Sequence, residues 1–290
     1  MLNWNNLDTL ASYQELEKAE RINLAEVMSG ENGAERVKTY STPIVDGLTF
    51  NYAAKAVDDN VLAILDKLAK EAQLVEKYES LYNGAVINTG EKRLVLHQLT
   101  RGQLGGKVEA DGVDKREFYV TQQKRIAEFA NQVHAGEITN AAGEKFTTVV
   151  QIGIGGSDLG PRAMYLAMEN WAKKNGAFKM EAKFISNVDP DDAAAVLNSI
   201  DVEHSLFVLV SKSGTTLETL TNESFVKDAL AKAGLDASKH MIAVTSETSP
   251  LAKSDDYLAA FFMDDFIGGR YSSERMENVS VYSPIFPDVS

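Results

Sequence analysis

The stretch SLFVLVSKSGTTLET, residues 205–219, joins a continuous apolar run to a turn rich in hydroxyl groups. Apolar runs of about five residues that are bounded by turn signals are typical of strands buried on both faces of a parallel sheet. The segment that follows the turn, up to residue 234, has the spacing of a helix. The stretch therefore predicts a strand, a tight turn and a helix, which is the repeating unit of an α/β fold.

Similar units flank this stretch on both sides. Four further apolar runs, TTVVQI, AKFISN, MIAVT and AAFFM, lie between residues 147 and 263, and helix-sized segments follow the first two. This alternation predicts an α/β fold with a doubly wound parallel sheet and right-handed crossovers. The residues before about 145 are predicted to be mainly helical, with one helix over residues 56–84, another over 116–136, and a surface loop over 102–114 between them.

Composition limits the classes of function. The chain has 290 residues, a net charge of −13 and no cysteine. Disulfides and thiolate metal sites are therefore excluded, and an intracellular setting is expected. The acidic balance argues against nucleic acid as a partner, although a local nest of backbone N–H groups can still bind a small anion. Because the chain shows neither a signal peptide nor an apolar stretch of about 20 residues, we expect a cytoplasmic protein with no membrane partner.

The turn after the first predicted strand, QIGIGGSDLG, contains a glycine cluster. Gly155, Gly156 and Ser157 stand together, and such a cluster suits close approach of the backbone to a ligand. The turn is also similar to a dinucleotide-binding fingerprint, so a nicotinamide oxidoreductase is one alternative. Asp158 occupies the third glycine position of that fingerprint, where a carboxylate would oppose a pyrophosphate.

The hydroxyl-rich turn of the opening stretch predicts an anion site. Its hydroxyl groups accompany the free N–H groups and the positive dipole end of the helix that begins there, and a phosphate ester is the natural occupant. The alternative is an ordinary capping cluster completed by Glu218, but capping needs only one hydroxyl. The hydroxyl groups belong to Ser211, Ser213, Thr215 and Thr216.

A third segment, FIGGRYSS, places Arg270 directly after Gly268 and Gly269. A guanidinium held close by two glycines can stabilise a developing oxyanion, although the same segment could be a turn with a surface arginine. We expect His97, in RLVLHQL, to be a packed core group rather than a catalyst. No pair of histidines has the spacing of metal ligands, so no metal site is predicted.

Together, and in this order, these segments resemble the glucose-6-phosphate isomerase family. The resemblance covers residues 40–272 and rests on INTGEKRLVLHQLTR, VQIGIGGSDLGPRA, FISNVDPDD, VLVSKSGTTLET and IGGRYS. It implies a sugar-isomerase (SIS) domain of flavodoxin-like topology over residues 121–271. Residues 1–120 would then be part of the family's larger domain, and residues 272–290 would form an atypical tail.

The resemblance also implies a reaction, which belongs to glycolysis and gluconeogenesis. The family interconverts glucose 6-phosphate and fructose 6-phosphate through a cis-enediolate, without a cofactor, as a homodimer. By resemblance, Arg270 stabilises the enediolate, and Gly156 and Ser157 contact the substrate. The positions that match the family's phosphate-binding loop are Ser211, Lys212, Ser213, Gly214, Thr215 and Thr216.

After IGGRYS the chain departs from the family and reads SERMENVSVYSPIFPDVS. The family's general base is a glutamate, its ring-opening histidine comes from the partner subunit, and a lysine lies near its C-terminus; all three fall beyond this departure. We therefore expect an N-terminal portion of the isomerase that binds hexose 6-phosphates weakly and turns over little or nothing. The alternative is a stand-alone SIS module that senses a phosphosugar.

Overall fold

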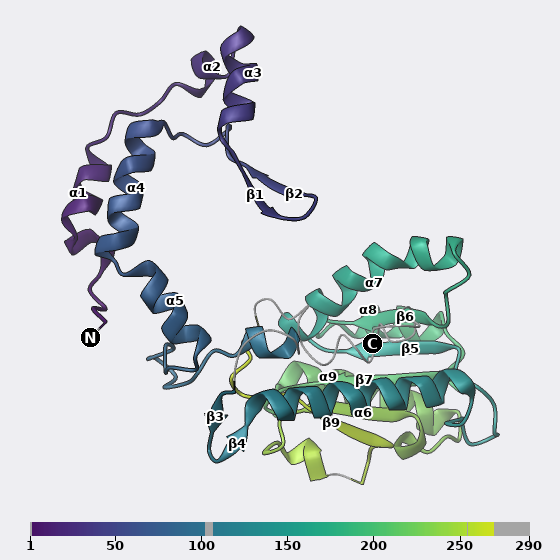
Figure 1. Ribbon diagram of the computed structural model, residues 1–290. Helices are drawn as coiled ribbons and strands as arrows, with labels where there is room; N and C mark the ends of the chain where they lie inside the picture. The colour runs from purple at the N-terminus through teal and green to yellow at the C-terminus, as the bar shows by residue number, and fades with distance from the viewer. Residues whose placement is uncertain (1, 102–106, 254, 270–290) are drawn as a thin grey trace. The chain divides into compact units, whose positions relative to one another are not determined.

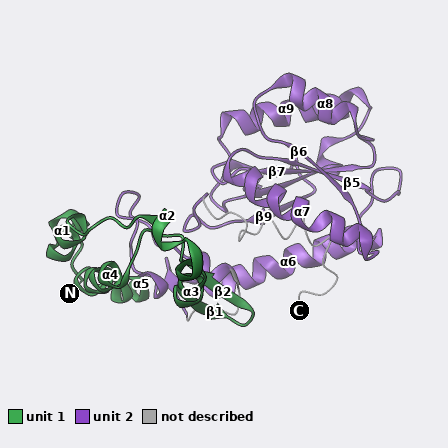
Figure 2. Cartoon of the chain, turned by 90° about the horizontal axis from the view of Figure 1, so that it is seen from above, with its two compact units in different colours: residues 1–80 green, residues 81–290 purple. Residues whose placement is uncertain are grey.

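The computed structural model describes residues 2–101, 107–253 and 255–269. The chain divides into two compact units, residues 1–80 and 81–290 (Figure 2). The domain limits at residues 120 and 271 stay a prediction.

The first unit consists of short helices and one β-hairpin. Helix α1 packs beside α4, and the carboxylate of Glu71 accepts the backbone N–H of Ser12 at 2.9 Å. Antiparallel strands β1 and β2 form the hairpin, which the expectation of a mainly helical region did not include. The elements are η1 (Leu7–Thr9), α1 (Ala11–Glu17), α2 (Leu24–Val27), α3 (Gly30–Thr39), β1 (Ser41–Val45), β2 (Leu48–Asn51), α4 (Asp59–Glu71) and α5 (Leu74–Tyr82).

The helix predicted over residues 56–84 is two helices. Asp58 caps the first one, because its side chain accepts the N–H of Val61 at 2.7 Å. Helix α4 ends at Glu71, and Gln73 then adopts a left-handed conformation with φ 52°. A left-handed residue cannot continue a right-handed helix, so α5 begins anew at Leu74.

The second unit is an α/β sheet, which confirms the predicted fold class. Its five strands are all parallel and lie in the order β6-β5-β7-β8-β9 (Figure 1). This is the flavodoxin-like order, in which the first strand lies inside the sheet. The elements of the sheet are β5 (Thr148–Ile152), α7 (Gly156–Lys174), β6 (Glu181–Ile185), α8 (Pro190–Asn198), β7 (Ser205–Val210), α9 (Leu217–Lys232), η3 (Ala237–Lys239), β8 (Met241–Thr245), η4 (Pro250–Lys253) and β9 (Ala259–Phe262).

Alternate residues of each central strand enter two different cores. In β7, Leu206 and Val208 face the core shared with α6 and α7. Phe207 and Leu209 face the core shared with α8 and α9. Every residue of β5 and β7 is buried, because helices cover both faces of the sheet. Burial on both faces is the reason that these strands read as nearly continuous apolar runs.

The segment that leads into the sheet is partly ordered as strands. Within residues 102–114, predicted to be a loop, the described part forms the small hairpin β3 (Glu109–Ala110) and β4 (Val113–Asp114), which follows η2 (His97–Arg101). Asp114 then caps α6 (Lys115–Ala135) by accepting the N–H of Arg116 at 3.0 Å. The predicted helix over residues 116–136 is confirmed, and Gly136 ends it with φ 80°.

Candidate functional site

The candidate site lies at the carboxyl ends of β5 and β7, where the strand order reverses. The two strands are adjacent and in parallel register, with Ile152 opposite Leu209. The chain leaves β5 toward β6 on one side and leaves β7 toward β8 on the other. In open α/β sheets this reversal opens a crevice between the two turns, and ligands bind there.

In the turn after β5 the backbone folds back so that Gly153 lies against the carbonyl group of Ser157. A side chain on Gly153 would collide with the carbonyl group of Ser157, and Gly155 has φ 58°, a conformation that favours glycine. Helix α7 begins at the next residue, Gly156. The glycine cluster therefore serves a sharp strand-to-helix turn and leaves Gly156 and Ser157 at the start of α7, beyond the carboxyl end of β5.

Asp158 in the same turn has a structural partner. Its carboxylate is buried and lies 2.9 Å from the guanidinium of Arg162, which also donates to the Ser186 hydroxyl at 3.0 Å. Burial raises the pKa of Asp158, and the charge of Arg162 opposes that rise. The pair fastens α7 to the segment that follows β6.

The turn after β7 orders its hydroxyl groups in two pairs. The Ser211 hydroxyl accepts the Gly214 N–H at 3.2 Å and donates to the Thr216 hydroxyl at 3.3 Å. The Ser213 hydroxyl accepts both the N–H and the hydroxyl of Thr215, at 3.2 and 3.0 Å. Ser211 is buried, whereas Ser213 and Thr215 are exposed. The inner pair shapes the turn and the outer pair faces outward.

The start of α9 bears on the capping alternative. Thr216 occupies the N-cap position, yet its side chain makes no capping hydrogen bond to the helix backbone. Capping by Thr216 therefore does not account for the hydroxyl cluster. The hydroxyl groups of this turn stand at the N-terminus of α9, and an anion site there stays a prediction.

Gly214 is required at the centre of this turn for two reasons. Its φ is 67°, which is left-handed, and a side chain there would collide with Ser249 and approach Leu251 to 3.0 Å. The turn also contacts the neighbouring strand, because the Thr245 hydroxyl donates to the Ser211 carbonyl at 2.7 Å. The turn after β7 is therefore held by the segment after β8.

The segment after β9 reaches both turns. The carbonyl of Gly269 lies against Gly156, so that a side chain on Gly156 would collide with it. The Lys212 ammonium donates to the Ile267 carbonyl at 3.4 Å. The three sequence-predicted segments, after β5, β7 and β9, thus converge at one place in the fold.

A buried ion pair holds the beginning of the third segment. Lys115 Nζ lies 3.0 Å from Asp264 Oδ2, and both side chains are almost fully buried. Tyr119 is buried beside them; burial raises its pKa, and the negative charge of Asp264 raises it further. The Asp264 carboxylate also accepts the N–H of Phe266 at 3.1 Å. Sequence analysis missed Lys115 and Asp264, because nothing in the chain marks two residues so far apart as partners.

From the sequence, His97 is predicted to be a packed core group, but the structure places it only partly in the core. It is partly buried, and its Nε2 accepts the N–H of Gly268 at 3.1 Å. Arg270 and the tail, residues 272–290, lie outside the described residues.

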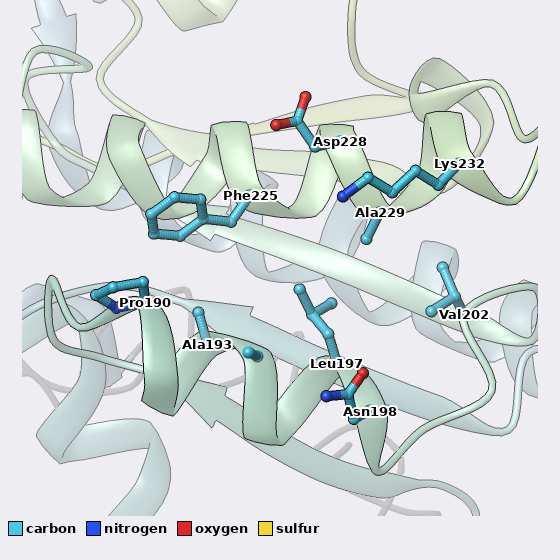
Figure 3. Close-up of a pocket in the computed structure, with 10 residues that line it drawn as sticks. Pro190, Ala193, Leu197, Asn198, Val202, Phe225, Asp228, Ala229 and Lys232 are labelled. Carbon is cyan, nitrogen blue, oxygen red and sulfur yellow. The ribbon is translucent and has the colours of Figure 1, made fainter.

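A hollow on the described surface lies elsewhere, between α8 and α9 (Figure 3). Its volume is about 370 Å³, and it contains none of the predicted site residues. Phe225 and Leu197 point into it from opposite helices, as Figure 3 shows.

No group of three or more His, Asp or Glu side chains within the described residues is placed to hold a metal ion. None of the helices in the described part of the chain is long and apolar enough to cross a membrane.

Comparisons with known proteins agree on one family. The family model described as "Phosphoglucose isomerase" matches residues 51–281. A glucose-6-phosphate isomerase of Treponema denticola is 57% identical, over 98% of this chain and 54% of its own length. One of Treponema pallidum strain Nichols is 54% identical, over 95% of this chain and 52% of its own length.

A solved structure agrees as well. The crystal structure of a glucose-6-phosphate isomerase from Chlamydia trachomatis matches with a TM-score of 0.83 and 36% identity, over 97% of this chain and 53% of that one. The chain spans about half the length of the curated relatives it matches. On the family match and these identities, the chain belongs to the phosphoglucose isomerase family.

Proposed function

We propose that the crevice at the ends of β5 and β7 binds a hexose 6-phosphate, and that the protein interconverts glucose 6-phosphate and fructose 6-phosphate. The observation that carries this proposal is the turn after β7. It combines two exposed hydroxyl groups, on Ser213 and Thr215, with the N-terminus of α9, whose N-cap side chain leaves the helix backbone uncapped. Oriented donors at a helix N-terminus favour a phosphate dianion.

The proposed roles follow the positions of the segments. The phosphate binds to the turn after β7, and the sugar extends toward Gly156 and Ser157 at the start of α7. Family membership supports these roles. The residues of the proposed phosphate site are Ser211, Lys212, Ser213, Gly214, Thr215 and Thr216.

The proposed chemistry moves one proton between C2 and C1 of the open-chain sugar. Loss of the C2 proton of the aldose places negative charge on the enediolate oxygens, which a guanidinium can stabilise. Transfer of the O2 hydroxyl proton to O1 and return of the carbon-bound proton to C1 then give the ketose. We propose Arg270 for the guanidinium. None of the described residues is assigned as the general base that this proton transfer requires.

The proposal includes a cellular setting and an assembly. A hexose phosphate is doubly charged and stays in the compartment where it is made, so we propose that the protein acts in the cytoplasm. We also propose a homodimer for the whole isomerase. Light scattering on the 290-residue chain and on a full-length relative, measured side by side, tests the assembly.

Calorimetry tests the binding site. Fructose 6-phosphate should bind, and unphosphorylated fructose should not. Ser213→Ala should weaken binding by at least about tenfold, because a hydrogen bond to a charged group contributes about 1.5–3 kcal/mol. Ser224→Ala is the matched control, since its exposed hydroxyl lies within α9, away from the turn, and donates to the Thr221 carbonyl. Equal affinity for both sugars, or no effect of Ser213→Ala, would refute the proposal.

A further inference from the structure

The segment from Asp264 to Gly269 is held in place by Leu96 and His97, where η2 begins. The Leu96 N–H donates to the Phe266 carbonyl at 3.1 Å. The next residue, His97, accepts the Gly268 N–H through Nε2 at 3.1 Å. Leu96 and His97, adjacent in sequence, thus hold the backbone of this segment at two points, 170 and 171 positions farther along the chain.

The bond to Gly268 requires a particular form of His97. An Nε2 that accepts an N–H carries no proton of its own, so the ring is neutral and has its hydrogen on Nδ1. A protonated imidazole is a donor at both nitrogens and cannot accept the Gly268 N–H. The contact therefore exists in only one of the two protonation states of His97.

The held segment forms part of the candidate site. Its Gly269 carbonyl lies against Gly156, at the start of α7, and its Ile267 carbonyl accepts from Lys212, in the turn after β7. Gly268 lies between Ile267 and Gly269, so a shift of its backbone would disturb the contacts with both turns.

We propose that His97 is a positioning residue of the sugar-phosphate site. Its neutral imidazole holds the backbone of Gly268, and this contact fixes the position of Gly268 and Gly269 beside Gly156. This inference rests on the proposed function. It assigns to His97 no contact with the substrate. Protonation of His97 breaks its hydrogen bond with Gly268 and frees the backbone of Gly268 and Gly269. Affinity for the sugar phosphate therefore falls as the pH is lowered and His97 takes up a proton.

Other charged groups lie on the segments that pack around this contact. Arg93 precedes His97 and donates to the Asp265 carbonyl at 3.5 Å. Asp264 is paired with Lys115 of α6. Lys212 approaches from the turn after β7. Of these groups only His97 ordinarily titrates between pH 5 and 8, so a change of binding within that range is assigned to it once the ligand's own titration is subtracted.

Two substitutions separate the acceptor from the charge. His97→Gln keeps an acceptor but cannot titrate in this range, whereas His97→Phe keeps a ring and loses the acceptor. The phosphate monoester itself changes charge near pH 6, so affinities for fructose 6-phosphate are compared between variants at each pH from 5 to 8. Wild type should lose about threefold to tenfold more affinity on acidification than His97→Gln, the range expected for one hydrogen bond.

At pH 8 the two variants should differ from each other. His97→Gln should bind about as tightly as wild type, and His97→Phe about threefold to tenfold more weakly. His204→Gln is the matched control; this histidine contacts Asp201 and Glu144 at the opposite end of the sheet, and its variant should keep the acid-side loss of the wild type. Identical pH profiles for wild type and His97→Gln would overturn the positioning role.

A ligand-free readout separates this inference from the proposed function. Amide hydrogen exchange of Gly268 should be faster in His97→Phe than in wild type or His97→Gln. Unchanged exchange would overturn the hold on Gly268 whether or not a ligand binds. If wild type binds no hexose phosphate while the exchange differs as expected, then the proposed function fails and the backbone contact stands.

Discussion

The carbonyl of Gly269 occupies the place where a side chain on Gly156 would begin, although 113 positions separate the two glycines. One residue opens α7 after β5, and the other ends the described segment after β9. Neither strand pairs with the other, since β7 and β8 lie between them. This close approach shows that the segment after β9 reaches the turn after β5 at the carboxyl end of the sheet.

Gly156→Ala should therefore displace the segment that contains Gly269. Backbone atoms cannot yield as the tip of a side chain can, so we expect affinity for fructose 6-phosphate to fall at least about tenfold, as a shift in site geometry does elsewhere. Calorimetry measures the change. Gly90→Ala is the control, because the added methyl group would meet only the Asn88 side chain, at an ordinary 3.7 Å. Wild-type affinity in Gly156→Ala would contradict this prediction.

Gly214→Ala and Gly234→Ala distinguish backbone strain from lack of space. Both glycines are left-handed, with φ 67° and 74°, but only Gly214 has neighbours within 4 Å of the added group. We expect Gly234→Ala to lower the free energy of unfolding by about 1 kcal/mol through strain alone. Gly214→Ala should lower it by roughly 2–4 kcal/mol, since overpacking adds to the strain. Urea unfolding measures both, and equal losses would show that the contacts with Ser249 and Leu251 have no energetic effect.

Lys115→Met should be strongly destabilising. It leaves the Asp264 carboxylate buried without its cation, which typically costs about 3–5 kcal/mol of the free energy of unfolding. The double variant Lys115→Met with Asp264→Asn should recover most of the loss, because a neutral amide is less costly to bury and can still accept the Phe266 N–H. If the double variant were as unstable as the single one, loss of packing rather than unpaired charge would be the cause.

The stability of the sheet should depend on pH through His204. Its two ring nitrogens lie 2.8 Å from Asp201 and from Glu144, and these bonds raise the pKa of His204. The bond to His204 lowers the pKa of Asp201. The raised pKa of a histidine stabilises the fold fully below its unfolded value, near 6.5, and the contribution is lost as pH rises through the folded value. The lowered pKa of Asp201 acts above its unfolded value, near 4, so both contributions are present between about pH 5 and 6.

The free energy of unfolding should therefore fall between pH 6 and pH 8 by more in wild type than in His204→Gln. Urea unfolding of both proteins at the two pH values measures the difference. Because the histidine is partly exposed, added salt should reduce the effect. Parallel behaviour of the two proteins would show that the ion pairs do not contribute.

The sequence was most informative where one physical cause dominates. Runs such as LFVLV are apolar throughout because two helical layers cover them, so the strands and their order of appearance could be predicted. The hydroxyl-rich turn could also be singled out from the sequence, because it holds more hydroxyl groups than helix capping requires.

Local conformation and distant partners were less visible. Nothing in the apolar periodicity of residues 56–84 marks Gln73, whose left-handed φ divides the expected helix. The bond between His97 and Gly268 joins segments that only the finished sheet brings together. Periodicity reports which face of an element is buried, and it carries no information about such pairs.

The pairing of Ile152 with Leu209 also has a consequence for folding. The two residues are 57 positions apart, yet the turns that follow them begin at neighbouring strand ends. Contacts so distant in sequence form slowly, because the intervening chain must first be closed into a loop. A ligand that bridges the two turns binds only after this pairing is complete, and mass action then stabilises the finished sheet. A hexose phosphate present during refolding would then stabilise molecules in which the sheet is already paired, and it would not raise the rate of the early folding steps.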